Sequence, residues 1–308
     1  MNNPADVLAS QEFGDLVVDE IGNPYLACIQ GRANQPITVK ALLNRAWDLL
    51  KDETGFCGLA DFSQQAIIER LVANRPRVCI IQGSADHPAH LFDHEHALRA
   101  AARIWQNGGV PFTFGVPVIC DGTAQSNIGQ SYSLASRNHT AMAVNINFEG
   151  HSYHAAYVIA GCDKSPAAIL SGLAAADRAR REPERGTAPV WAVFVPAHVL
   201  KGGSIPPGTR MKLQSVQERA RAKGNAQLAN DIEDNCHYIL QCSSDEAFLA
   251  LLNRATECGL TDRPTANAIL DELSAATCDD KGGICAFNGT GNSSRTLFSA
   301  LGFVPEHS

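Results

Sequence analysis

The sequence predicts an α/β protein, a three-layer α/β/α sandwich with a mainly parallel sheet and a helical N-terminal segment. From about residue 76 onward, short apolar, β-prone runs alternate with longer segments of helical spacing, which is typical of parallel strands joined by crossover helices. Before that point the chain shows amphipathic helical spacing, in residues 39–50 and 64–72. We therefore expect a helical segment over residues 1–75 packed on a main α/β domain over residues 76–308.

Four apolar runs are expected to form the sheet. Each is short, uncharged and rich in β-branched or aromatic residues, as strands buried on both faces should be. They span residues 78–82, 113–119, 155–160 and 190–195. Helices are expected between them over residues 91–105, 134–148 and 167–177.

The remainder of the chain is expected to be loops and helices. Residues 178–185 alternate arginines with acids, which favours a solvated loop. Proline and glycine in residues 202–208 indicate another loop. Helical stretches are expected near residues 215–229 and 245–258, before a glycine-rich tail that leads into a terminal helix.

Composition restricts the class of function. The 308 residues are 45% hydrophobic and 19% charged, which is enough apolar material for a core. The N-terminus lacks the basic and apolar regions of a signal peptide, and no apolar run approaches the roughly 20 residues that span a bilayer. We expect a cytoplasmic protein with no membrane partner. The net charge of −7 without a compensating basic block argues against nucleic acid and favours a small-molecule partner.

The chain has ten cysteines and no CxxC pair. This spacing argues against a zinc ribbon, and a reducing compartment argues against disulfides. Cys28, Cys79, Cys236 and Cys242 are expected to be small buried hydrophobic residues.

One short stretch of the sequence contains candidate metal-binding residues. Residues 160–166 read AGCDKSP and follow an expected strand, and Ser165 can serve as N-cap and Pro166 as the first residue of the next helix. Cys162, Asp163 and Lys164 would therefore lie on a strand-to-helix turn at the carboxyl edge of the sheet, where ligands bind in open α/β sheets. A thiolate, a carboxylate and an amine at that place suggest a metal or cluster site.

These motifs resemble the N-terminal domain of the dihydroxy-acid dehydratase and 6-phosphogluconate (sugar-acid) dehydratase family. The similarity extends over roughly residues 75 to 305. The residues that match the family's motifs are Asn107, Gly108 and Gly109, then Asp121, Gly122, Gly129, Tyr132, Ser133, Leu134, Ser136 and Arg137, then Cys162, Asp163 and Lys164, and finally Gly283, Cys285, Thr290 and Asn292.

The resemblance implies a hydro-lyase with two metal cofactors. By matching position, Asp121, Asp163 and a carbamylated Lys164 would bind Mg²⁺, which places Lys164 among the catalytic residues. Cys162 and Cys285 would be ligands of a [2Fe–2S] iron–sulfur cluster. The donor atoms of these residues suit the implied cofactors, because Mg²⁺ prefers hard oxygen ligands and iron prefers thiolates.

Two departures from the family pattern alter this expectation. The position of the family's first cluster cysteine holds Ala89, so the cluster is short of one ligand unless His87, His90 or His94 replaces it. Alternatively, these histidines are only polar residues around the start of a helix and bind no metal. The loop over residues 125–130 also differs from the family, so the substrate is not identified.

A third departure concerns the family's C-terminal β-barrel domain, which supplies a further magnesium ligand and the serine base and is not found before Ser308. The expected function is a metal-binding subunit of a split or truncated dihydroxy-acid or sugar-acid dehydratase that acts on a small hydroxy acid. A separate chain would then carry the barrel, and the protein would form a homodimer. The alternative is a non-catalytic or repurposed small-acid-binding homologue that pairs with or regulates a partner protein.

Overall fold

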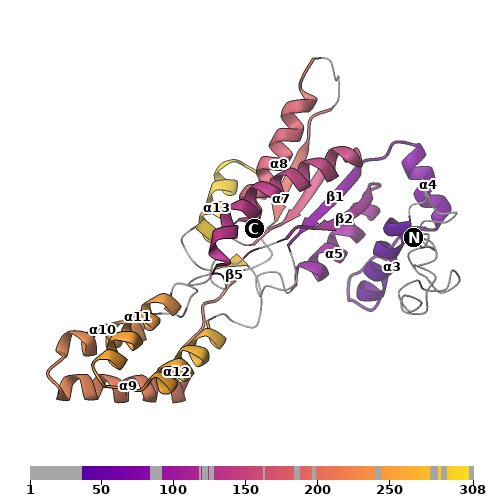
Figure 1. Cartoon of the computed structure of the whole chain (residues 1–308). Helices are drawn as coiled ribbons and strands as arrows, with labels where there is room; N and C mark the ends of the chain where they lie inside the picture. The colour runs from indigo at the N-terminus through magenta and orange to yellow at the C-terminus, as the bar shows by residue number, and fades with distance from the viewer. Residues whose placement is uncertain are drawn as a thin grey trace, which may run out of the picture.

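The computed structural model describes residues 37–83, 92–117, 119, 124, 128–161, 164–183, 188–195, 199–238, 240, 244–277, 284–285 and 290–304. Within these ranges a parallel sheet lies between helices, and a group of helices that follows it in the chain stands apart (Figure 1). The predicted α/β fold class is confirmed.

The sheet has four parallel strands in the order β2-β1-β3-β4. They are β1 (Arg77–Gln82), β2 (Val110–Gly115), β3 (Ala155–Ile159) and β4 (Trp191–Val195). Three of them lie within a residue or so of the predicted runs, whereas β2 begins three residues before, and ends four residues before, the predicted 113–119. The prediction started too late because the strand contains Pro111, which an edge strand such as β2 tolerates.

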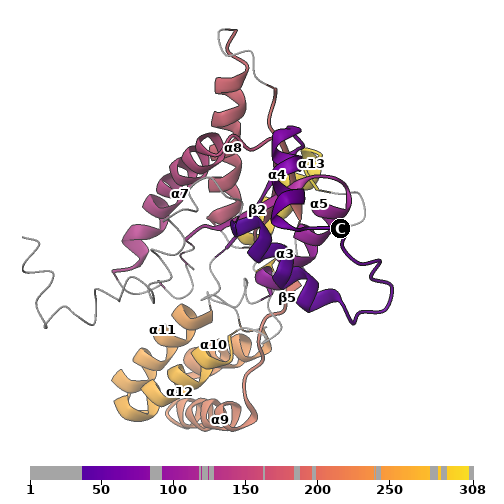
Figure 2. The ribbon, with the colours of Figure 1, turned by 90° about the vertical axis from the view of Figure 1, so that its right-hand side faces the viewer.

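Three helices cover one face of the sheet, as a view at right angles shows (Figure 2). They are α3 (Ile37–Leu50), α4 (Gln64–Val72) and α5 (Asp93–Gln106). Buried Ile80 of β1 and Ile159 of β3 pack in one cluster with Ala97 and Ala101 of α5 and with Ala46 of α3. Both predicted N-terminal helices are confirmed, and α3 packs directly on α5.

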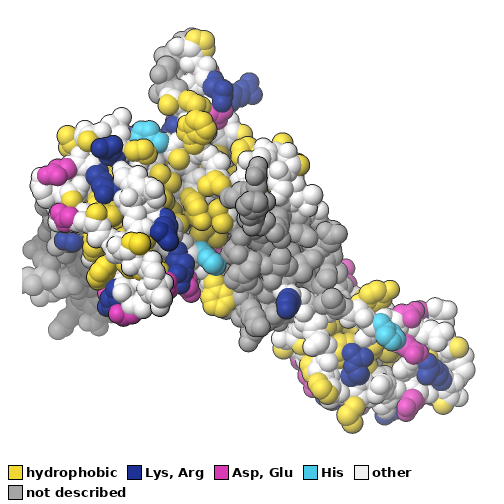
Figure 3. All heavy atoms as spheres, turned by 180° about the vertical axis from the view of Figure 1, so that it is seen from behind, with side chains coloured by type: hydrophobic (Ala, Val, Ile, Leu, Met, Phe, Trp, Pro, Cys, Tyr) yellow, Lys and Arg dark blue, Asp and Glu magenta, His cyan; other side chains and the backbone are white. Residues whose placement is uncertain are grey.

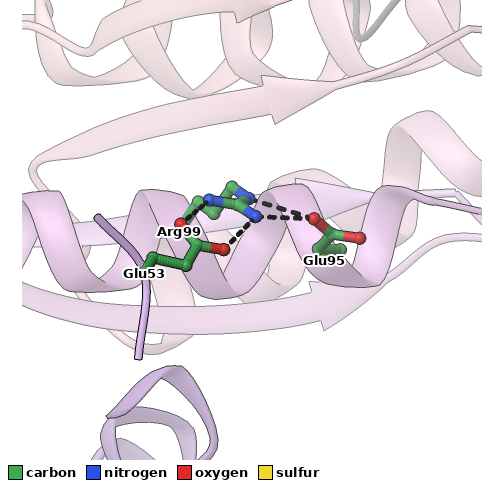
Figure 4. Close-up of polar contacts among 3 residues, drawn as sticks. All are labelled: Glu53, Glu95 and Arg99. Carbon is green, nitrogen blue, oxygen red and sulfur yellow. Dashed lines mark hydrogen bonds and ion pairs between the residues drawn. The ribbon is translucent and has the colours of Figure 1, made fainter. Parts of the chain in front are cut away.

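An ion-pair network joins the end of α3 to α5 (Figure 4). Arg99 donates to both carboxylate oxygens of Glu53, at 2.6 and 2.7 Å, and also to Oε1 of Glu95 at 2.8 Å. Bidentate arginine–carboxylate pairs have fixed geometry, so this contact orients the turn that follows α3.

Two long helices cover the other face. They are α7 (Gln130–Gly150) and α8 (Ser165–Arg180), and they pack closely on each other. Ile81 of β1 and Val158 of β3 pack there with Val144 of α7 and Ile169 of α8. Phe298 of α13 (Thr290–Ala300), the expected terminal helix, packs against Phe194 of β4 with ring centroids 4.2 Å apart and ring planes inclined by 31°.

The basic run that was expected to form a solvated loop is partly helical. Arg178 and Arg180 lie in the last turn of α8, and Arg180 is buried. Its guanidinium donates to Oε1 of Glu149 at 2.8 Å and to the Tyr153 carbonyl at 2.7 Å. The loop prediction was wrong for these two residues. Partners at the end of α7 and in the turn before β3 satisfy the charge of Arg180, which local sequence places at the surface.

The second group of helices has a hydrophobic core of its own. It consists of α9 (Pro207–Ala222), α10 (Ala226–His237), α11 (Ser244–Glu257) and α12 (Arg263–Ala275). We call residues 207–275 the helical unit. Figure 3 shows side chains of both charges interspersed on its surface.

The prediction of a single helix over residues 215–229 was wrong. Gly224 has φ +77° between α9 and α10, a conformation that ends a helix and that glycine adopts readily. Helix α12 was not predicted. Its N-cap is Asp262, whose carboxylate accepts the N–H of Thr265 at 2.7 Å.

A pair of short strands flanks the helical unit in the chain. Strand β5 (Val199–Leu200) pairs in parallel with β6 (Ile284–Cys285). Nearby, the Gly203 N–H lies 2.9 Å from the Leu240 carbonyl and 3.0 Å from that of Thr277, which connects both ends of the unit.

The described cysteines differ in environment. Cys79 is fully buried in β1, and burial raises the pKa of its thiol well above its usual range. Its expected role as a small hydrophobic residue is confirmed. Cys236 is partly buried against the core of the helical unit. Cys28 and Cys242 lie outside the described residues. No described helix is long and apolar enough to cross a lipid bilayer.

Candidate metal centre at the carboxyl edge of the sheet

The strand register brings the carboxyl ends of neighbouring strands together. Gln82 of β1 pairs with Gly115 of β2 on one side and with Ile159 of β3 on the other. Because all the strands are parallel, the segments that follow these three residues leave from one edge of the sheet. Asp121 belongs to the segment after β2, and Cys162 and Asp163 belong to the segment after β3. These three predicted site residues lie outside the described residues.

The structure describes the beginning and the end of the turn after β3, which contains the predicted triplet. Gly161 is buried at its start, and Lys164 is the N-cap of α8 with φ −95° and ψ −34°. The expected strand-turn-helix order is confirmed. The expected cap was wrong, because Lys164 takes that position and Ser165 is the first helical residue. The Lys164 carbonyl accepts the Ala168 N–H at 3.0 Å.

Ser165 stands out among the buried polar side chains. It is 2% exposed, and its hydroxyl has no hydrogen-bond partner within the described part of the chain. Buried polar groups are usually satisfied, and leaving one without a partner costs about 1–3 kcal/mol. A hydroxyl at the N-terminal turn of α8 can pair with a bound water or with an oxygen of a ligand. The sequence singled out Ser165 only as a cap.

Asp93 is a buried carboxylate at the same edge that the sequence analysis missed. It lies in the first turn of α5, and its Oδ2 accepts the N–H of Gly83, directly after β1, at 3.3 Å. The sequence does contain a signal for Asp93, which is an acidic residue in the first turn of a helix that follows a strand. Ala89, His87 and His90 lie outside the described residues, and His94 is exposed on α5.

Cys285 approaches the edge from a different part of the chain. It pairs in backbone register with Leu200 of β5. Leu200 follows Val195, the last residue of β4, by five residues, so their Cα atoms are at most roughly 18 Å apart. Figure 1 shows β5 between the sheet and the helical unit. The backbone of Cys285 therefore lies within roughly 23 Å of the carboxyl end of β4.

The donor set agrees with the cofactors that the resemblance implies. Carboxylates and a lysine that can be carbamylated supply hard oxygens, and two cysteines supply thiolates. The Ser165 hydroxyl, which has no hydrogen-bond partner among the described residues, adds a polar group at the turn that contains the triplet. Among the described residues, no group of three or more His, Cys, Asp or Glu side chains could hold a metal ion.

Comparison with known proteins supports the motif-based resemblance. Residues 75–181 match the family described as dihydroxy-acid/6-phosphogluconate dehydratase N-terminal. This segment contains Asp121, the Cys162–Lys164 triplet, Asp93 and Ser165.

Curated relatives named dihydroxy-acid dehydratase are similar over a longer part of the chain. The protein of Desulfitobacterium hafniense is 29% identical over 217 residues, which are 70% of this chain and 30% of that protein. The protein of Picrophilus torridus is 34% identical over 120 residues, 38% of this chain and 19% of that protein. The protein of Helicobacter hepaticus is 29% identical over 172 residues, 56% of this chain and 27% of that protein.

The matched regions thus span less than a third of each relative's length. They correspond to the N-terminal part of those proteins, as the motifs predict. Residues 75–181 are therefore similar to the N-terminal domain of the dihydroxy-acid/6-phosphogluconate dehydratase family.

Proposed function

We propose that this chain carries the metal-binding part of a dehydratase active site that acts on a small hydroxy acid. The observation that supports this most is the register of β1, β2 and β3. Because of this register, the segment that contains Asp121 and the segment that contains the Cys162–Lys164 triplet both begin at one edge of the sheet. Metal ligands from separate segments can act together only if the fold brings them to one place.

The proposed ligands follow the family's pattern. Asp121, Asp163 and carbamylated Lys164 would hold Mg²⁺, and Cys162 and Cys285 would hold an iron–sulfur cluster. When bound, the metals supply Lewis-acid stabilisation of the charge that develops on the carboxylate and hydroxyl of a hydroxy acid.

The start of α8 favours the negative charges that this chemistry needs. Lys164 caps a helix of 16 residues, whose N-terminal N–H groups create a partial positive charge. That field would stabilise negative charge on Asp163, on a carbamate of Lys164 and on the carboxylate of a substrate. The buried Ser165 hydroxyl can orient a water or ligand oxygen at the same turn.

Metal binding is the direct test. We expect the anaerobically purified chain to bind one Mn²⁺, used as a paramagnetic substitute for Mg²⁺, and Asp163→Asn to weaken that binding at least about tenfold. Asp271→Asn, on an exposed position of α12, is the matched control and should leave the affinity unchanged. Electron paramagnetic resonance titration measures both. Equal affinities of the wild type and Asp163→Asn would remove the magnesium assignment.

Iron content tests the cluster and separates the two candidate functions. We expect little iron and sulfide after aerobic purification, and more after anaerobic reconstitution of Ala89→Cys, because that change restores the family's third thiolate. Dehydration of a dihydroxy acid by the reconstituted protein, alone or with a barrel-type partner, supports the hydro-lyase. Binding of the acid and metal without turnover in either case supports the repurposed, small-acid-binding homologue.

A further inference from the structure

A hollow of about 470 Å³ lies where the two ends of the helical unit meet. It lies between the first turns of α9 and the last turn of α12, and these two helices are in contact (Figure 2). We call it the α9–α12 hollow. Its volume is within the range of roughly 300–1,000 Å³ that is usual for small-molecule sites. The residues that line it include Pro206, Gly208, Thr209, Lys212, Glu272 and Ala275, none of which belongs to the proposed metal centre.

Two side chains of the hollow form an ion pair that can still bind a ligand. Lys212 Nζ donates to Oε1 of Glu272 at 2.5 Å, and the Thr209 hydroxyl donates to Oε2 at 2.6 Å. The Lys212 and Glu272 side chains are nevertheless 43% and 40% exposed. An ammonium has three N–H donors and a carboxylate has about four acceptor sites, so both groups can bind a ligand without losing their contact.

The contacts of Glu272 keep it charged and in place. The hydrogen bond from Lys212, and then the one from Thr209, lowers the pKa of Glu272 below its ordinary value. Thr209 is only 1% exposed, so its hydroxyl fixes the position of the carboxylate at the start of α9. The hollow therefore contains a fixed negative charge directly beside a positive one.

The remaining surface of the hollow is apolar. Pro206, Gly208 and Ala275 have no polar side-chain atoms. A Cβ added at Gly208 would have no tertiary contact within 4 Å among the described residues, so the space beside this residue is open. Aliphatic groups of a ligand can occupy such a surface, whereas a charged group would find no partner there.

The charges of the hollow favour a zwitterion over a simple ion. A carboxylate alone is attracted by Lys212 but repelled by Glu272, and an amine alone meets the reverse situation. An α-amino acid has both groups on one carbon atom, so its carboxylate can pair with Lys212 while its ammonium pairs with Glu272. A side chain without polar atoms then matches the apolar part of the hollow.

We propose that the α9–α12 hollow binds a small α-amino acid with an aliphatic side chain. The bound molecule contacts both ends of the helical unit, close to the place where the chain enters it. A Cβ at Gly203 would lie 1.5 Å from the carbonyl oxygen of Ala276, and Ala276 also lines the hollow. Because the ligand requires both ends to be in place, binding stabilises the helical unit.

Isothermal titration calorimetry of the full chain with L-norvaline tests the proposal. We expect saturable binding with a millimolar or lower dissociation constant. Pentanoate lacks the ammonium of norvaline and butylamine lacks its carboxylate, so each should bind at least about tenfold more weakly. The proposal is overturned if norvaline does not bind in this range, or if either analogue binds as tightly as norvaline.

A charge variant tests the role of the ion pair. Glu272→Gln should weaken norvaline binding at least about tenfold, because a neutral amide cannot pair with the ammonium. Glu233→Gln is the matched control, since Glu233 also accepts hydrogen bonds from a basic side chain, Arg221, and from Gln217, but does not line the hollow. It should leave the affinity unchanged. Equal affinities of the two variants would contradict the assignment.

A steric variant tests the hollow without changing its charges. Gly208→Leu places an aliphatic side chain in the open space, so norvaline binding should be lost. Ala222→Leu, at an exposed position near the end of α9, is the control and should bind norvaline normally. Far-UV circular dichroism shows whether all four variants are folded. A folded Gly208→Leu protein that binds norvaline like the wild type would place the ligand elsewhere and refute the proposal.

Discussion

Arg180 and Arg181 are adjacent in sequence, but their surroundings differ. Arg180 is buried, contacts Glu149 and Tyr153, and lies over the Phe148 ring at 5.0 Å from its centroid. Arg181 is exposed and pairs with Asp177 one turn earlier on the same helix. Burial decides how much each interaction contributes to stability, because water competes with an exposed ion pair.

We expect Arg180→Lys to lower the free energy of unfolding by about 2 kcal/mol, because a single ammonium cannot reproduce both hydrogen bonds and leaves a buried acceptor without a donor. Arg181→Lys should leave the stability unchanged within error. Urea unfolding followed by circular dichroism measures both variants. Equal effects would show that the Arg180 contacts add no more than a surface pair.

His154 gives the fold a dependence on pH. Its Nδ1 accepts the backbone N–H of Arg77 at 3.0 Å, which requires the neutral ring. Burial, and then the charges of Arg77 and Arg180, lower the pKa of His154 below its ordinary value of 6.5. As pH falls through that value, the unfolded chain takes up a proton before the folded chain does, so stability decreases until the lower folded pKa is reached.

The urea midpoint should therefore fall between about pH 7.5 and pH 5.5. His154→Asn can keep an acceptor for the Arg77 N–H without a titrating group, and its midpoint should fall less over the same interval. An identical decrease in both proteins would assign the pH dependence to other groups.

At the scale of elements, the contact between α7 and α8 depends on a missing side chain. A Cβ at Gly172 of α8 would lie 2.5 Å from the Ala141 carbonyl oxygen and 3.0 Å from Val144 of α7. Asn145 of α7 also donates to the Gly172 carbonyl at 3.2 Å. The small residue lets the two helices approach closely and share this hydrogen bond.

Gly172→Ala should destabilise the protein by about 1–3 kcal/mol, because the backbone of α7 must shift to accommodate the methyl group. Gly208→Ala is the control, since Gly208 lies in the first turn of α9 with no atom within 4 Å of the added carbon. That change should be neutral or stabilise by up to about 1 kcal/mol. Thermal unfolding compares the two, and a neutral Gly172→Ala would refute the close contact.

At the scale of the whole molecule, the sheet with its covering helices and the helical unit have separate cores. All three tryptophans of the chain, Trp47, Trp105 and Trp191, lie in α3, α5 and β4. Tryptophan fluorescence therefore reports on the sheet region, whereas far-UV circular dichroism reports on both regions. The two signals can separate the unfolding of one core from that of the other.

We expect the fluorescence and circular dichroism transitions in urea not to coincide. Leu213→Ala, at a fully buried position of α9, should destabilise the helical unit by about 2–4 kcal/mol and shift only the circular dichroism transition. Coincident transitions, shifted together by Leu213→Ala, would show that the two cores unfold as one cooperative unit.

The sequence alone determined the approximate positions and the parallel direction of the strands, the helices on their two faces and the similarity of residues 75–181 to a dehydratase N-terminal domain. These properties depend on local periodicity and on motifs that stand close together in the chain, as the predicted and observed strands at Ile80 and Val158 illustrate. The proposed ligand set, centred on Asp163 and Lys164, also came from sequence.

Only the tertiary structure decided which polar groups are buried and how the chain is divided into cores. Asp93, Ser165 and Arg180 are all buried. Arg180 contacts Glu149 and Tyr153, which are far away in sequence, so no local pattern marks its burial. The separate core of the helical unit likewise depends on which helices meet. The physical reason is that periodicity shows which side of an element is apolar, whereas the partner that covers that side is selected by packing of the whole chain.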